Sequence, residues 1–467
     1  MSQSSVLLIV LFFYAILLIA IGLWTKGRNK DQKDFFLGGR NLGPIVASLS
    51  YSASAASAWT LLGLTGLTYA IGVSSIWVVL GSFLGAVISW FWIAPRLMNF
   101  SRNNNIITLT DFITFGSVGY KKQLILIISS LIVLFCFSVY VAAQFQGAGN
   151  TFSSSFGTPM SHSIIIGGLI VMIYTFLGGF WAVSITDTVQ GFLMAITALV
   201  LPVFALIEVG GLSGFIEGLV LVSSIEQLSF TLGNSGLLGL GVIIGSIAIG
   251  VGQFGQPHLL IRFMALRDTK SLNMGFFFTI IWYLIVFLGM YFVGLVGHIL
   301  IPSIDNNEAI LFAVSDYLFS PIISGIIIAA VLSAIMSTAD SQLLVTASVI
   351  SYDLGLGKKF PGYELYISRL AIIFIVSIAI IVAIIMPSSI FDRVVFAWVA
   401  LGCAFGPLVF TRLGGIDCGP NSIILSILTG FSLAVFFSLQ PSAFGFTVDR
   451  LLPFFLSLFF LLVFKRV

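Results

Sequence analysis

The chain has 467 residues, of which 59% are hydrophobic and 8% are charged. Soluble domains carry about 25% charged residues, so the composition excludes an ordinary soluble protein and predicts an all-α polytopic membrane protein. The formal net charge of +3 is spread over the connections between apolar segments, so it does not indicate a nucleic-acid partner.

Windows of about 19 residues predict 13 apolar spans. The first span lacks the basic n-region of a cleavable signal peptide, so we expect it to be retained as a peripheral helix. The predicted ranges are 4–24, 45–70, 74–95, 123–147, 162–180, 188–209, 236–256, 274–299, 320–349, 368–387, 391–411, 421–440 and 446–464.

The basic residues agree with this count, because positive charge concentrates on the cytoplasmic side of a membrane. With the N-terminus outside and the C-terminus cytoplasmic, 18 of the 20 Lys and Arg residues fall inside, and only Arg393 and Arg450 fall outside. We therefore expect a multi-pass protein of the plasma (cytoplasmic or inner) membrane and interpret the basic residues as topology signals. The inner set is Lys26, Arg28, Lys30, Lys33, Arg40, Arg96, Arg102, Lys121, Lys122, Arg262, Arg267, Lys270, Lys358, Lys359, Arg369, Arg412, Lys465 and Arg466.

The second span holds Ser, Ala, Gly and Thr where a lipid-facing helix would hold Leu and Ile. Residues 48–66 read SLSYSASAASAWTLLGLTG. Small residues let helix backbones approach closely, and such a segment can unwind inside a protein, so that its carbonyls are free to coordinate a cation. The alternative is close helix packing, with each hydroxyl bonded back to its own helix.

The seventh span has a similar interruption at residues 245–257, GSIAIGVGQFGQP, where repeated glycine and a proline favour a broken helix. Spans two and seven lie five apart, so each can be the first helix of a five-helix unit. Because five is an odd number of crossings, the two units have opposite orientations in the membrane. Paired interrupted helices indicate the midplane site of a transporter. We expect one domain over 1–467, with a first repeat at 45–211, a second at 236–411 and two C-terminal helices within 421–467.

Two carboxylates lie at or near membrane depth, Asp340 in the ninth span and Asp187 at the start of the sixth. Carboxylates are costly in lipid, so both are functional candidates, although Asp187 is also placed to cap a helix N-terminus. The three histidines show no ligand-like spacing, and for them we expect ordinary hydrogen bonding. The three cysteines show no CxxC spacing, so neither a disulfide nor a metal site is predicted from them.

The ninth span also carries a polar helix face. Its members at helical spacing are Ala334, Ser337, Thr338 and Ser341, with Asp340 at the edge. Two hydroxyls together with carbonyls from a broken neighbouring helix form the all-oxygen shell that suits Na⁺. Bonding of Ser337 and Thr338 to their own helix is the alternative.

Several long motifs in one order carry a resemblance that spans nearly the whole chain. On these motifs the chain resembles the sodium/solute symporter family, and within it the sodium/proline permease branch. The motifs are DFFLGGRNLGP at 34–44, SASAASAWTLLGLTG at 52–66, YTFLGGFWAVSITDTVQGFLM at 174–194, FGQPHLLIRFMA at 254–265, MSTADSQLL at 336–344 and AFGPLVF at 404–410.

The resemblance implies a leucine-transporter-type fold, in which spans two to eleven form an inverted five-plus-five repeat. It also implies a function, the sodium-coupled import of a small polar organic solute by alternating access, with Na⁺ as the coupling ion. The implied sodium site takes backbone carbonyls of Ala53, Ala56 and Ala334 and the hydroxyls of Ser337 and Thr338. By the same resemblance, Arg40 and Asp187 influence coupling from the inner side, and the substrate lies near Ser57, Trp59, Gly63, Tyr140 and Ser341.

Three positions depart from the proline branch. Ala55 stands where proline members carry an Asp, Ile249 where they carry a Trp and Gln253 where they carry a Tyr. We expect Ile249 and Gln253 to shape a more polar pocket. Asp340 stands where the proline permease has an uncharged residue, and we hypothesise that it restores the negative charge lost at Ala55.

The expected solute is an amino acid such as proline, and the alternatives are pantothenate, a short monocarboxylate or another zwitterion. A transporter-like membrane sensor is the alternative from another class. An enzyme is not expected, because no cluster of nucleophile, base and orienting group occurs in the sequence. We expect no organic cofactor and no obligatory protein partner.

Overall fold

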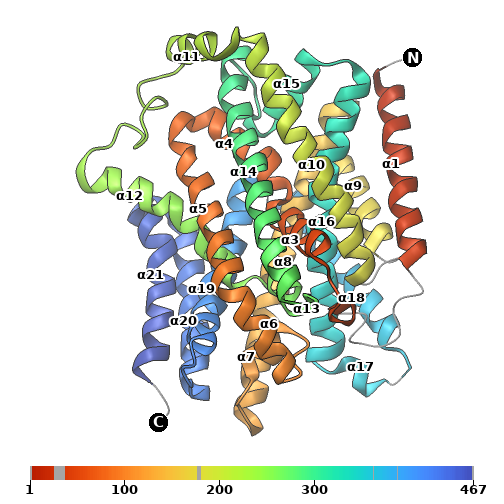
Figure 1. Ribbon diagram of the computed structural model, residues 1–467, viewed down its shortest axis with the longest axis vertical. Helices are drawn as coiled ribbons and strands as arrows, with labels where there is room; N and C mark the ends of the chain where they lie inside the picture. The colour runs from red at the N-terminus through yellow and green to blue at the C-terminus, as the bar shows by residue number, and fades with distance from the viewer. Residues whose placement is uncertain (1–2, 26–36, 176–179, 361, 387, 465–467) are drawn as a thin grey trace.

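The computed structural model describes residues 3–25, 37–175, 180–360, 362–386 and 388–464. Long helices run side by side between the two ends of a bundle (Figure 1). The described residues form helices and loops, with one isolated backbone bridge in place of a sheet. Nine helices in this part of the chain are long and apolar enough to cross a membrane. The all-helical membrane fold predicted from composition is confirmed.

The helices have the following bounds. The first half of the chain forms α1 (Gln3–Thr25), α3 (Pro44–Ala58), α4 (Leu64–Ile71), α5 (Ile76–Ile88), α6 (Ala94–Asn103), α7 (Leu109–Thr114), α8 (Gly119–Phe156), α9 (Met160–Thr175), α10 (Phe180–Glu208) and α11 (Gly211–Val222). The second half forms α12 (Gly236–Ile247), α13 (Pro257–Ala265), α14 (Thr269–Leu300), α15 (Ile310–Leu318), α16 (Pro321–Ser348), α17 (Leu356–Lys359), α18 (Glu364–Ile385), α19 (Ile390–Leu413), α20 (Pro420–Leu439) and α21 (Pro441–Val463). Short 3₁₀ and π turns are η2 (Gly38–Arg40), η3 (Trp59–Gly63), η4 (Gly72–Ser75), η5 (Ser89–Ile93), η6 (Ala248–Gly255), η7 (Asn307–Ala309) and η8 (Val349–Asp353).

The first interrupted segment breaks at Ser57, inside the small-residue stretch. Ser57 has φ 21° and ψ −170°, and a π turn, η3, follows it. The side chain of Gln144 on α8 occupies the break: its Oε1 accepts from the Ala58 N–H at 3.1 Å, and its Nε2 donates to Ser57 Oγ at 3.3 Å. The Gln144 amide oxygen therefore gives the Ala58 N–H the acceptor that a regular helix would have supplied, as a buried backbone group requires.

The second interrupted segment breaks between α12 and α13. A 3₁₀ stretch, η6, follows α12, and Gln256 is extended before Pro257 starts α13. Glycine is required here by close approach, since a Cβ on Gly252 would lie 1.8 Å from Cδ1 of Trp398. That approach lets Trp398 Nε1 donate to the carbonyl of Ile249 at 3.0 Å. Both breaks expected from the sequence are present.

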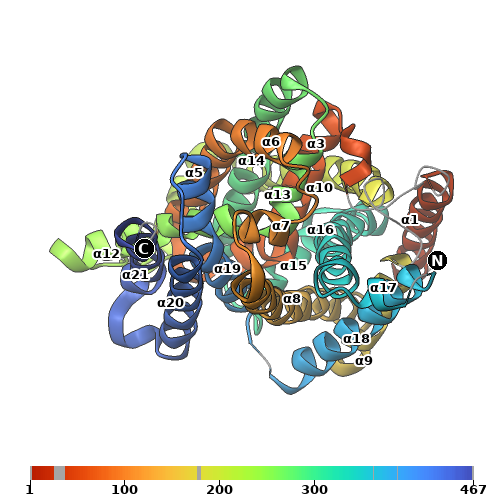
Figure 2. The ribbon, with the colours of Figure 1, turned by 90° about the horizontal axis from the view of Figure 1, so that it is seen from below.

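The first broken helix lies at the centre of the bundle. The helix α3 packs against α10, α14 and α16, and α16 is buried over almost its whole length. Seen along the bundle, α1 lies at one margin while α20 and α21 lie at the other (Figure 2). At the end that carries α6 and α7, the backbone of Leu42 bonds both to the Ala265 carbonyl and to the Arg267 amide at 3.0 Å, which joins the chain before α3 to the end of α13. Six of the basic residues counted from the sequence, Lys26, Arg28, Lys30, Lys33, Lys465 and Arg466, lie outside the described residues.

Candidate functional site

The residues expected to bind sodium meet where α16 crosses the break in α3. Ser337 Oγ lies 3.2 Å from the carbonyl oxygens of both Ala53 and Ala334. Thr338 Oγ1 donates to the carbonyl of Ser54 at 3.0 Å. The Thr338 hydroxyl therefore bonds across to the broken helix, and Ser337 faces both helices. Ala56 is buried on the same turn of α3, and its carbonyl accepts from the Trp59 N–H.

These oxygens suit a hard monovalent cation. Carbonyl and hydroxyl oxygens are the ligands that Na⁺ takes, whereas zinc and copper prefer nitrogen and sulfur. Within the described ranges, no group of three or more His, Cys, Asp and Glu side chains gathers as a transition-metal site would require. The crossing therefore brings hydroxyl and carbonyl oxygens of α3 and α16 to one place.

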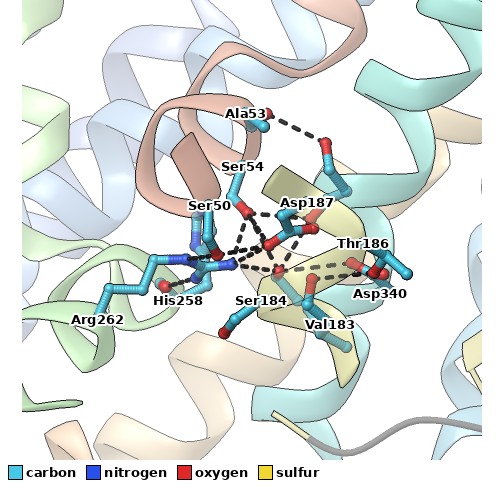
Figure 3. Close-up of polar contacts among 12 residues, drawn as sticks. Ser50, Ala53, Ser54, Val183, Ser184, Thr186, Asp187, His258, Arg262 and Asp340 are labelled. Carbon is cyan, nitrogen blue, oxygen red and sulfur yellow. Dashed lines mark hydrogen bonds and ion pairs between the residues drawn. The ribbon is translucent and has the colours of Figure 1, made fainter. Parts of the chain in front are cut away.

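A charged cluster lies beside this crossing, and Figure 3 shows it in close-up. Asp187 Oδ2 accepts from Arg262 Nη2 at 2.7 Å and from Ser50 Oγ at 2.7 Å. The same Arg262 nitrogen lies 2.7 Å from the hydroxyl oxygens of Ser54 and Ser341. We define the charged cluster as these five residues. Their ion pair is shielded from solvent, since the side chains of Arg262 and Asp187 are 1% and 0% exposed.

The charged cluster corrects two interpretations of the sequence. Arg262 was counted only as a cytoplasmic topology signal, yet its guanidinium neutralises a buried carboxylate, which is a role that charge counting cannot detect. Helix capping by Asp187 is also wrong, because α10 already starts at Phe180, and Asp187 lies in the helix interior. A buried carboxylate requires a cation partner, and an Arg in the second broken segment was the signal that could have predicted the pair.

Ser54 and Ser341 connect the charged cluster to the predicted sodium site. Both hydroxyls donate to the carbonyl of Ser337, at 3.0 and 2.9 Å. Asp340 lies alongside, fully buried, with its Oδ1 3.4 Å from Ser341 Oγ and its Oδ2 without a hydrogen-bond partner. Ser341, expected near the substrate, is thus a member of the charged cluster.

The other residues expected near the substrate surround the break in α3. The hydroxyls of Tyr140 and Ser57 lie 3.5 Å apart. Trp59 Nε1 donates to the carbonyl of Ala55 at 3.0 Å. The Trp59 ring makes edge-on contact with Phe391 on α19 at a centroid distance of 6.1 Å, and a Cβ on Gly63 would lie 3.3 Å from that of Phe391.

Gln253, expected to contact the solute, bonds to neighbouring helices. Its Oε1 accepts from the Tyr51 hydroxyl at 3.0 Å, and its Nε2 donates to the Ser82 carbonyl at 2.7 Å. The Ile249 side chain is buried, at 2% exposure. Gln253 therefore joins α3 and α5, with both ends of its amide occupied.

His258 is a further residue in this region, and the sequence interpretation missed it. Its ring lies edge-on to those of Phe137 and Tyr140, at centroid distances of 5.4 and 6.2 Å. The ring is fully buried among these aromatic side chains. The expectation of ordinary hydrogen bonding stays a prediction for His258.

Arg40 lies apart from the charged cluster. Its guanidinium donates to Ser101 Oγ at 2.9 Å and to the carbonyl of Ile106 at 2.7 Å, in the connection that follows α6. Burial, with the nearby charge of Arg102, lowers its pKa. Arg40 therefore ties two connections at one end of the bundle, and any influence on Asp187 is indirect.

At the opposite end, Glu308 on η7 holds the start of α19 above Trp59. Its Oε1 accepts from the Phe391 N–H at 3.2 Å. Burial raises the pKa of Glu308 to about 7. Hydrogen bonds from the Phe391 and Ile390 amides lower the pKa but do not cancel the effect of burial. Because Phe391 contacts Trp59, Glu308 is linked through Phe391 to a residue expected near the substrate.

We expect the protein to be less stable at alkaline pH because of Glu308. Its pKa is raised above the ordinary value of 4.5, so its contribution to stability is complete below about pH 4.5 and is lost as pH rises through about 7. The contribution is on the order of 3 kcal/mol. Thermal unfolding in detergent, measured from about pH 5 to about pH 8, should show a falling midpoint. The decrease of the midpoint with pH should become smaller in Glu308→Gln and should remain in the control Glu226→Gln. An equal decrease in wild type and in Glu308→Gln would show that Glu308 does not cause it.

Known proteins are similar to this chain in sequence and in fold. Residues 35–413 match the model of the sodium:solute symporter family. The chain belongs to this family. It is 35% identical over 420 residues to the osmoregulated proline transporter OpuE of Bacillus subtilis, covering 88% of this chain and 84% of that protein. It is 36% identical over 446 residues to a sodium/proline symporter of Salmonella typhimurium, covering 92% and 87%.

Solved structures agree on the fold. A Na⁺-coupled sialic acid symporter, in a substrate-bound outward-open state, superposes with a TM-score of 0.81 at 18% identity, covering 98% of this chain and 97% of that one. MhsT, solved in complex with L-phenylalanine, superposes with a TM-score of 0.54 at 13% identity over 91% of this chain and 98% of that one. As a member of the sodium:solute symporter family, the chain is a membrane transporter and not an enzyme.

Proposed function

We propose that the chain imports proline, or a closely similar zwitterion, together with Na⁺. The crossing of α3 and α16 is the observation that supports sodium binding. There the hydroxyls of Ser337 and Thr338 face backbone carbonyls of the broken helix α3. The family membership supports sodium as the coupling ion, and the names of the relatives support proline as the solute.

The proposed architecture has 13 membrane helices. Spans two to eleven would form an inverted five-plus-five repeat, each unit opening with a broken helix. The breaks at Ser57 and at η6 support this arrangement. The proposed topology, in the plasma membrane with the N-terminus outside and the C-terminus cytoplasmic, rests on the distribution of Lys and Arg.

In the proposed cycle, sodium bound between α3 and α16 stabilises the outward-open state. The solute then closes the pocket beneath Trp59, and both are released inward. One charge moving down a potential of about 100 mV supplies about 2.3 kcal/mol. That corresponds to roughly a 50-fold gradient of a zwitterionic solute, before any sodium gradient is added.

The second candidate for the solute is a different zwitterion. Ile249 and Gln253 replace the aromatic residues of the proline branch, and both ends of the Gln253 amide already bond to neighbouring helices. The test is uptake of labelled proline into proteoliposomes under an inward sodium gradient, with unlabelled solutes as competitors. Accumulation that excess proline abolishes supports proline. Sodium-driven accumulation of another solute would show that this solute is the substrate and that the mechanism is still sodium-coupled import. If no solute accumulates, the protein is not an importer, and a sensor is favoured.

We expect Asp340→Asn to weaken sodium dependence. The carboxylate is fully buried beside the charged cluster, and its Oδ1 lies 3.4 Å from Ser341 Oγ, which itself lies 2.7 Å from Arg262 Nη2. Removing one negative charge should raise the sodium concentration for half-maximal uptake by about tenfold, which corresponds to about 1.4 kcal/mol. The measurement is the uptake rate against sodium concentration, with Asp316→Asn as the control. An unaltered sodium dependence would show that Asp340 does not compensate for Ala55.

A further inference from the structure

The peripheral helix α1 contacts the bundle through one narrow face. Leu7 and Leu18 are 3% and 1% exposed, whereas Phe12 and Phe13 are 64% and 66% exposed. Tyr14 lies between the two buried leucines at helical spacing, on the face that packs against α10 and α16. It places a hydroxyl in a contact that is otherwise apolar.

The Tyr14 hydroxyl joins α10 to α16 through a directed chain of hydrogen bonds. Gln190 Nε2 on α10 donates to it at 3.1 Å. Ser333 Oγ on α16 lies 2.7 Å away and itself donates to the Ala329 carbonyl at 2.7 Å. Because the Ser333 proton is used there, the Tyr14 hydroxyl is the donor to Ser333. The tyrosine therefore accepts from one helix and donates to the other.

This chain of bonds lies one helical turn from the charged cluster on α10 and one helical turn from the proposed sodium site on α16. Gln190 follows Asp187 by three residues on α10, and Ser333 precedes Ser337 by four residues on α16. Ser333 also directly precedes Ala334, whose carbonyl is a proposed ligand. Gln190 and Ser333 are fully buried, so no water is available to replace a lost partner.

We propose that Tyr14 is a positioning residue for sodium binding, whose hydroxyl fixes α16, with the proposed ligands Ala334 and Ser337, relative to α10 and the charged cluster. The inference rests on the proposed sodium coupling. Without the hydroxyl, Gln190 Nε2 loses its acceptor and Ser333 Oγ its donor. The two helices then shift to satisfy those groups, and the oxygens of Ala334 and Ser337 move relative to Asp187.

The test is the Tyr14→Phe variant in proteoliposomes, which keeps the ring and removes only the oxygen. We expect the sodium concentration for half-maximal uptake to rise about fivefold, which corresponds to about 1 kcal/mol lost from sodium binding. The proline concentration for half-maximal uptake at saturating sodium should change less than about twofold, since the pocket around Tyr140 is untouched. Tyr120→Phe, at an exposed tyrosine on α8, is the matched control.

A second variant and a second readout complete the test. Ser333→Ala removes the α16 partner of the Tyr14 hydroxyl and should raise the sodium concentration for half-maximal uptake by the same factor. Because both changes break one chain of hydrogen bonds, the double variant Tyr14→Phe with Ser333→Ala should show no larger rise than either single variant. Sodium-induced stabilisation against thermal unfolding, measured in detergent, should weaken in parallel without any transport assay. If uptake by wild type depends on sodium and both variants respond to sodium as wild type does, the role of Tyr14 is overturned and the proposed function stands. If uptake by wild type does not depend on sodium, the proposed function is overturned together with the role of Tyr14.

Discussion

Asp187→Asn is expected to abolish sodium-driven uptake and to lower the free energy of unfolding by about 3–5 kcal/mol, the effect of removing one partner from a buried ion pair. The guanidinium of Arg262 is 1% exposed, so neither water nor the neutral serines Ser50 and Ser54 can replace the lost charge. Thermal unfolding and uptake should be measured on the same preparation.

Two control variants separate charge pairing from other effects. The Arg267–Asp268 pair has the same chemistry at the surface, with side chains 51% and 45% exposed, and Asp268→Asn should leave both readouts unaltered. The double variant Asp187→Leu with Arg262→Met should be more stable than Asp187→Asn, because no unpaired charge remains. If Asp187→Asn were as stable and as active as wild type, the charged cluster would have no role.

Thr338→Val is expected to raise the sodium concentration for half-maximal uptake by at least about tenfold, because hydrogen bonds and ligand contacts to charged groups are worth about 1.5–3 kcal/mol each. Valine keeps the shape of threonine and loses the oxygen that faces the Ser54 carbonyl. Thr338→Ser keeps that oxygen and should stay near wild type. The measurement is the initial uptake rate over a range of sodium concentrations at constant ionic strength.

The same helix supplies a control for this prediction. Thr346 is also buried, but its hydroxyl donates to the Gln342 carbonyl of its own helix at 2.8 Å. Thr346→Val should leave the sodium dependence unaltered. Equal effects of Thr338→Val and Thr338→Ser would show that size and not the hydroxyl matters at this position.

The two broken helices could be predicted from the sequence because their signal is local. Small residues around Ser57 and glycines around Gly252 are visible in the chain itself, and the structure breaks at both places. The helix face with Ser337 and Thr338 was likewise visible in the spacing, and it does meet the broken helix. Local composition and periodicity therefore located the crossing of α3 and α16.

The partners of the buried charges could not be predicted in the same way. Arg262 lies 75 residues from Asp187 along the chain, and only the packing of α13 against the bundle brings them together. Gln144 fills the break in α3 from α8, and no local pattern marks a glutamine for that role. Such pairs depend on which helices become neighbours, which composition and charge counting do not encode.

If sodium and solute cross the membrane together, a gradient of either one must drive the movement of the other. Purified protein in proteoliposomes should take up radioactive sodium when an inward proline gradient is imposed with no sodium gradient, because coupling between two ligands acts in both directions. We predict sodium uptake that requires proline and that, at the sodium concentration for half-maximal uptake by wild type, is strongly reduced in Thr338→Val. Proline entry with no accompanying sodium movement would contradict the account.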